Sequence, residues 1–141
     1  MKIEQRKYSR ISLPLKVSFR VIKGENRGIF SSAVEAETRD ISLGGLFLKT
    51  NFLEIDGLHI YHNSNTIFQN LLELDIDLPF SKGRITVLGK VVWYNLEKRR
   101  GKYEYNAGVS FLEIDDEDKK ILKKFLDSFS GKGKETLKER L

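Results

Sequence analysis

"LPLKVSFRVI", residues 13 to 22, carries the clearest structural signal in the chain. Lys16, Ser18 and Arg20 alternate with apolar side chains, which are Leu13, Leu15, Val17, Phe19 and Val21. Successive side chains of a β-strand point to opposite faces of the sheet. The pattern therefore predicts a strand with one buried face and one solvated face.

Further stretches of extended character follow, at residues 29–42, 46–50, 71–78, 84–96 and 103–114. Polar turns that contain glycine separate several of them, for example "KGENRG" and "EKRRGK". Residues 54–70 lack a sustained period, and we interpret them as a loop with one short helix or strand. That loop is longer than a minimal barrel needs, which leaves room for a partner or dimer surface.

The period changes after residue 114. The stretch "DDEDKKILKKFLDSF", residues 115–129, opens with acidic residues that suit the N-terminus of a helix. Its apolar residues recur at helical spacing and form one stripe, made of Ile121, Leu122, Phe125, Leu126 and Phe129. The whole pattern predicts a mainly β fold: a six-stranded antiparallel β-barrel, of Greek-key or split type, with a C-terminal α-helix.

Composition narrows the functional classes. A chain of 141 residues fits one domain, and the absence of cysteine excludes disulfides, thiolate metal sites and a cysteine nucleophile. No apolar run approaches the ~20 residues of a membrane span. The first ten residues lack the apolar stretch of a secretion signal, so we expect a cytoplasmic protein. The formal charge of +5 favours anionic partners.

Two short motifs bear on function. "RKYSR", residues 6–10, places Arg6 and Arg10 four positions apart near the N-terminus. "DISLGG", residues 40–45, follows thirty positions after Arg10. On a strand, Asp40 and Ser42 would point outward together while Ile41 and Leu43 face the core. Gly45 and its neighbour would let the backbone turn and leave room for a ligand, although Asp, Ser and Gly are also ordinary turn formers.

The order RxxxR, DxSxxG, "KVVWY", "AGVSFLEI" and a terminal helix resembles the PilZ domain family over roughly residues 5 to 127. The resemblance implies a six-stranded barrel that binds the bacterial second messenger cyclic di-GMP. It also implies an N-terminal arm, residues 1–12, whose two arginines wrap over the ligand. The barrel and helix would occupy residues 13–129, followed by a charged tail at 130–141. The implied ligand-binding residues are Arg6, Arg10, Asp40, Ser42 and Gly45.

The chemistry of these residue types suits the ligand. A guanidinium can form two parallel hydrogen bonds to a phosphate or to the O6/N7 edge of guanine, and it can stack on a base. The carboxylate of Asp40 can accept from the N1–H and N2–H groups of guanine, and the hydroxyl of Ser42 both donates and accepts. Gln5, just before Arg6, is neutral, which favours one ligand over a stacked pair carrying four charges. No other cofactor is expected.

No nucleophile–base pair or acid–base constellation is visible, so we expect a non-enzymatic binding module. It would signal to an unidentified downstream protein that controls motility, adhesion or exopolysaccharide production. The alternative is a PilZ-like adaptor that binds no nucleotide and acts only through protein contacts. Nucleic acid is not the expected partner, because the aromatic residues look internal. Both a monomer and a homodimer are compatible with the sequence.

Other features have plainer interpretations. His59 and His62 would face opposite sides of a strand, and no ligand set completes a metal site. "GKGKET" lacks the spacing of a phosphate loop. We place Trp93 in the core or at the rim of the barrel, and we interpret "EKRR" as a solvated hairpin tip.

Overall fold

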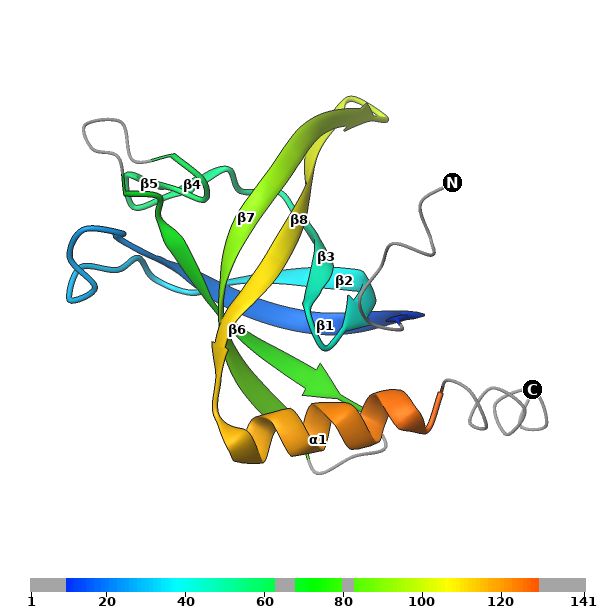
Figure 1. The fold of residues 1–141 in the computed structure, drawn as a ribbon. Coiled ribbons are helices and arrows are strands. Elements are labelled where there is room, and N and C mark those ends of the chain that lie inside the picture. Colours follow the sequence, from blue (N-terminus) through cyan, green and yellow to red (C-terminus); the bar gives the residue numbers. More distant parts are fainter. Residues whose placement is uncertain (1–9, 63–67, 80–82, 130–141) are drawn as a thin grey trace.

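The computed structural model describes residues 10–62, 68–79 and 83–129 of the chain (Figure 1). These residues form one helix, α1 (Asp116–Asp127), and strands whose bounds are β1 Arg10–Ile22, β2 Val34–Ser42, β3 Gly45–Thr50, β4 Glu54–Ile55, β5 Leu58–His59, β6 Leu71–Leu78, β7 Gly83–Arg99 and β8 Lys102–Ile114. No helix among the described residues is long and apolar enough to cross a membrane.

Six of the strands close into a barrel in the order β1-β2-β3-β8-β7-β6, and every neighbouring pair is antiparallel. Two three-stranded meanders, β1–β2–β3 and β6–β7–β8, join through the pairs β3·β8 and β1·β6. The short strands β4 and β5 form a separate hairpin. The predicted six-stranded antiparallel barrel is therefore confirmed.

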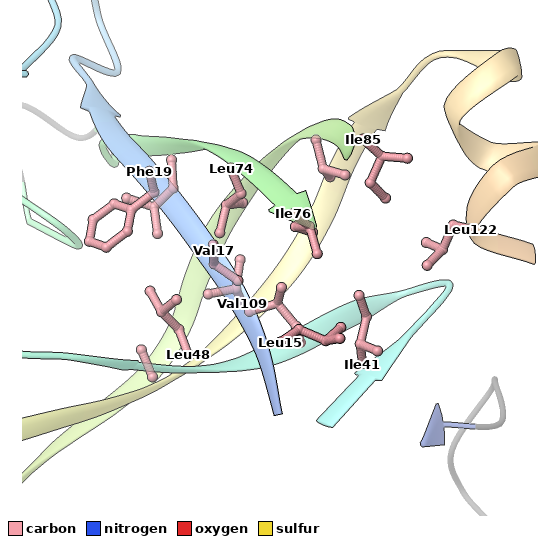
Figure 2. Close-up of a cluster of buried hydrophobic side chains, with 14 of the residues drawn as sticks. Leu15, Val17, Phe19, Ile41, Leu48, Leu74, Ile76, Ile85, Val109 and Leu122 are labelled. Atoms are coloured by element: carbon pink, nitrogen blue, oxygen red, sulfur yellow. The ribbon is translucent and has the colours of Figure 1, made fainter. Parts of the chain in front are cut away.

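The core fills the inside of this barrel. Four alternating residues of β1 are at most 3% exposed, namely Leu15, Val17, Phe19 and Val21. They meet inward-pointing side chains of the other strands, such as Leu48, Leu74 and Ile76 (Figure 2). The predicted period-2 pattern of β1 is confirmed from Leu15 to Val21, whereas Leu13 is only partly buried.

Helix α1 lies across one end of the barrel (Figure 1). Its buried residues Leu122, Phe125 and Leu126 belong to the same hydrophobic cluster as the strands. Asp115 caps the helix, because its carboxylate accepts a hydrogen bond from the backbone N–H of Asp118 at 2.8 Å. The predicted C-terminal amphipathic helix is confirmed, and its acidic start serves as a cap.

A bulge in β2 determines which residues face outward. The pairing with β3 skips a residue between Thr38 and Asp40, and the pairing of β1 with β2 shifts at the same level. Thr38 and Ile41 are both fully buried although they lie three positions apart, so Arg39 and Asp40 both lie on the outside. Pro14 sits in β1 opposite this irregularity, where the ladder does not need its missing N–H.

Some predicted bounds were wrong. The second strand begins at Val34 and not at residue 29, because residues 29–33 are loop apart from one bridge between Ile22 and Phe30. The first strand begins earlier than predicted, at Arg10. The segment that starts at residue 54 contains the β4–β5 hairpin, whose turn places Asp56 and Gly57 at φ of 53° and 81°.

Candidate functional site

Strand pairing brings the second motif arginine to the DxSxxG motif. Arg10 lies opposite Ser42, and Ser12 lies opposite Asp40, in the antiparallel pairing of β1 with β2. Directly opposite Cβ atoms in such a pair are about 4.5–5.5 Å apart. The register therefore unites Arg10, Asp40 and Ser42. Only the backbone of Arg10 is described, and Arg6 lies outside the described residues.

Ser12 is a residue that sequence reasoning missed. Its Oγ donates a hydrogen bond to Oδ1 of Asp40 at 2.7 Å across the β1–β2 pair. The bond fixes the orientation of the half-buried Asp40 carboxylate. The available signal was a hydroxyl two positions after Arg10, but its partner follows only from the register.

Ser42 organises the turn between β2 and β3. Its Oγ accepts a hydrogen bond from the N–H of Gly44 at 3.1 Å and donates to the carbonyl of Gly45 at 3.4 Å. Ile41 beside it is fully buried, whereas Asp40 and Ser42 are half-buried. The predicted orientation of the motif is thus observed, and Ser42 also has a structural role as a turn residue.

Gly45 is required by the packing of two strands. A Cβ built on Gly45 would lie 2.2 Å from the carbonyl oxygen of Val109 in β8, closer than any side chain tolerates. The neighbouring backbone makes a hydrogen bond from Phe111 N–H to the carbonyl of Gly44 at 2.9 Å. The close approach of β3 to β8 therefore explains this glycine without a ligand.

The outer face continues across the sheet from these residues. The pairings place Ser12, Asp40, Phe47, Gly108 and Trp93 in one cross-strand row. An adjacent row pairs Arg10 with Ser42 and, beyond the turn in which Ser42 contacts Gly45, pairs Gly45 with Ser110 and Ser110 with Lys90. We call the surface formed by these two rows the motif face. It carries a carboxylate, two hydroxyls besides Ser12, a lysine and two aromatic rings.

Trp93 lies on the outer surface of the barrel, so of its two predicted locations the core was wrong. A bulge between Val91 and Trp93 turns the strand, so that Val91 is fully buried while Trp93 is 43% exposed. The indole lies over Gly108, where a built Cβ would come within 2.2 Å of its Nε1. It also meets Phe47 edge-on, with ring centroids 5.6 Å apart. Trp93 therefore contributes a partly exposed aromatic ring to the motif face.

The two histidines lie at a turn with their ring centroids 4.9 Å apart, so they do not face opposite sides as predicted. Nδ1 of His59 accepts hydrogen bonds from the backbone N–H groups of Tyr61 at 3.0 Å and His62 at 3.1 Å. Burial and the nearby His62 lower the pKa of His59 below its usual 6.5, against the opposing effect of Glu54. Among the described residues, no three His, Cys, Asp or Glu side chains gather as a metal site.

A closed six-stranded barrel with one helix across its end, and with Arg10 paired to the DxSxxG turn, defines a small β-barrel domain. The model of the PilZ domain family matches residues 4–128 of the chain. The chain therefore belongs to the PilZ domain family.

Solved structures share this fold. The PilZ domain of YcgR from Escherichia coli, solved with c-di-GMP, aligns with a TM-score of 0.60 and 15% identity over 95% of this chain and 98% of that one. The Bacillus subtilis inhibitor of motility MotI (DgrA) aligns with a TM-score of 0.56 and 21% identity, over 89% of this chain and 50% of that one. MrkH of K. pneumonia aligns with a TM-score of 0.58 and 20% identity, over 85% and 47%.

The chain thus spans about half the length of MotI and of MrkH. No curated protein sequence matches it.

Proposed function

We propose that this chain is a non-enzymatic receptor for cyclic di-GMP. The observation that carries the proposal is the β1–β2 register, which sets Arg10 against Ser42 and Ser12 against Asp40 on the outside of the barrel. Membership of the PilZ family and the fold shared with the c-di-GMP complex of YcgR support it. A receptor for this bacterial second messenger would act in the cytoplasm.

Each motif residue has a chemical role in this proposal. Arg6 and Arg10 bind phosphate or the O6/N7 edge of guanine, and Asp40 accepts from guanine N1–H and N2–H. Ser42 adds a hydroxyl next to the bare backbone of Gly45.

The motif face offers two further contacts to a nucleotide. The exposed face of Trp93 can stack on a purine, which is worth about 1–3 kcal/mol in single-stranded nucleic-acid complexes. Lys90 shares a row with Ser42 and can bind a second phosphate as a point charge. The neutral Gln5 favours one nucleotide per chain.

The signal would pass through the arginine arm. In this proposal Arg6 and Arg10 close over bound nucleotide and create a new surface for a downstream protein that controls motility, adhesion or exopolysaccharide production. Amide hydrogen exchange of residues 1–9, which precede β1, should slow when cyclic di-GMP is added. Unchanged exchange in a saturated complex would contradict this step.

Calorimetric titration with cyclic di-GMP tests the receptor proposal. Each charge-assisted contact contributes about 1.5–3 kcal/mol, so Arg10→Ala should weaken binding by about 10- to 100-fold. The matched control is Lys16→Ala, which removes an exposed cation from the same strand, β1, away from the motif face. If the unaltered chain gives no binding heat with cyclic di-GMP, or if Arg10→Ala binds it with the same affinity, the proposal is wrong.

The second candidate is an adaptor that binds no nucleotide. It is favoured by the structural role of each described side chain of the DxSxxG motif: Asp40 pairs with Ser12, Ser42 holds the turn, and Gly45 fits against β8. The adaptor predicts a silent titration by a chain whose circular dichroism shows an intact barrel.

A further inference from the structure

The hairpin of β7 and β8 projects beyond the barrel as a two-stranded ribbon (Figure 1). Strand β6 pairs with β7 only as far as Gly89, and β3 pairs with β8 only from Tyr105 onward toward the helix. Beyond these points, residues 97–99 of β7 and 102–104 of β8 pair with each other alone within the described structure. The end of the ribbon therefore has two sheet faces with few neighbours, whereas at its base Tyr94 packs against the rings of Tyr61 and His59, with centroids 5.6 and 5.7 Å away.

One face of the ribbon is apolar and aromatic. It continues the inner surface of the barrel, because Leu48 pairs with the fully buried Ala107, and the side chains at 105 and 103 share that orientation. Its members, which we call the ribbon apolar face, are Tyr94, Leu96, Tyr103 and Tyr105. Leu96 and Tyr103 are each 53% exposed, so this continuation of the core face reaches solvent.

The opposite face of the ribbon is polar, and its acidic side chains form ion pairs with the barrel. Nζ of Lys49 lies 3.8 Å from a carboxylate oxygen of Glu97 and 3.4 Å from one of Glu104. Glu97 also accepts a hydrogen bond from the side-chain amide of Asn106 at 3.2 Å. Both acidic residues of the ribbon are thus engaged by the barrel, on the side away from the ribbon apolar face.

The tip of the ribbon is cationic. Lys98, Arg99, Arg100 and Lys102 occupy four of five consecutive positions around the turn. The amine of Lys98 lies 5.5 Å from the centroid of the Tyr103 ring, at the edge of the ribbon apolar face. Since Glu97 and Glu104 are paired with Lys49, the tip presents a net positive rim to this apolar surface.

We propose that the ribbon apolar face is a docking surface for an acidic, amphipathic segment of another protein. Apolar side chains of that segment cover Leu96 and Tyr103, while its carboxylates meet Lys98, Arg100 and Lys102. A second copy of this chain would bring an identical cationic tip, which would repel the first. A phosphate backbone has no apolar groups that could cover the exposed Leu96 and Tyr103. The proposal stands independently of nucleotide binding.

A photo-crosslinking experiment on the full chain tests this docking surface. The photoreactive residue p-benzoylphenylalanine replaces Tyr103, and in a matched control it replaces Phe30, which is 50% exposed on the loop before β2. After irradiation in the native cells, mass spectrometry identifies the crosslinked segment. We expect a crosslinked segment at position 103 and no crosslink of the same segment at position 30. In that segment, carboxylates should flank apolar residues.

Charge variants complete the test. The combined change Lys98→Glu, Arg100→Glu and Lys102→Glu should reduce the adduct about 10-fold or more, since exposed ion pairs each contribute modestly. The neutral set Lys98→Gln, Arg100→Gln and Lys102→Gln should give a smaller reduction. An adduct with a second copy, with nucleic acid or with a segment lacking acidic residues would overturn the proposal. So would a missing adduct, or one that charge reversal leaves undiminished.

Discussion

The motif face and the ribbon apolar face both draw on β7 and β8, but they are supported differently. The motif face lies on the outside of the barrel, where β2, β3 and β8 each pair with a strand on both sides and the inner surface is packed core. In the ribbon, each strand has only the other as a neighbour. The comparison indicates that the barrel fixes the positions of Asp40 and Ser42, whereas local contacts support Leu96 and Tyr103.

The largest effect should come from the same substitution made in the two regions. Leu74 is fully buried inside the barrel, and Leu96 is 53% exposed on the ribbon. Leu74→Ala should lower the free energy of unfolding by about 2–5 kcal/mol, because it removes buried methyl groups and leaves a cavity. Leu96→Ala should change it by about 0.5 kcal/mol or less.

Urea unfolding monitored by circular dichroism measures both variants. Equal losses for Leu74→Ala and Leu96→Ala would show that the ribbon is as well packed as the barrel. That result would remove the basis for treating the ribbon apolar face as an uncovered surface.

A second, smaller effect should appear at the turn of the motif face. Gly45→Ala would force a Cβ against the carbonyl of Val109, and overpacking of this kind costs about 1–3 kcal/mol. In the control Gly28→Ala, the new Cβ would lie 3.2 Å from the flexible side chain of Asn26, so little should change. If Gly45→Ala unfolds at the urea concentration of the unaltered chain, Gly45 is not held by β8.

A local pH dependence should distinguish the turn at the base of the ribbon from the barrel. The pKa of His59 is lowered by burial and by His62, so the folded turn favours the neutral ring that accepts from Tyr61 and His62. The unfolded residue titrates near 6.5. Stability of the turn is therefore constant above that pH and declines as the pH falls below it.

Amide hydrogen exchange of Tyr61 and His62, corrected for the intrinsic pH dependence, should accelerate as the pH falls below 6.5. His59→Asn supplies a control, because its side-chain oxygen can accept the same bonds without titrating. Persistence of the acid-induced acceleration in His59→Asn would assign the effect to another group.

The sequence was sufficient for the barrel and the helix. The period-2 alternation around Phe19 and the helical spacing around Leu122 both reflect burial against one core. The spacing of apolar residues in a sequence indicates which side chains are buried. The alternation of a strand also predicted that Asp40 and Ser42 lie on the outer surface. Their use by a ligand, together with that of Arg6, Arg10 and Gly45, stays a prediction.

The remaining features depend on register, which a single sequence does not display. The bulges beside Arg39 and Val92 shift which side chains point outward, and they put Trp93 on the motif face instead of in the core. The partnership of Ser12 with Asp40 links positions 28 apart in sequence. The reach of the β7–β8 ribbon follows from where β6 and β3 stop pairing, and no local pattern records that.

Tryptophan fluorescence during titration with cyclic di-GMP tests the central claim most directly. Trp93 is the single tryptophan of the chain, and it shares a cross-strand row with Asp40 on the motif face. Nucleotide bound at this face should change its emission saturably, and Arg10→Ala should shift that curve about 10- to 100-fold toward higher concentration. Emission that stays constant at saturating nucleotide, or a curve that Arg10→Ala leaves in place, would contradict a nucleotide site on the motif face.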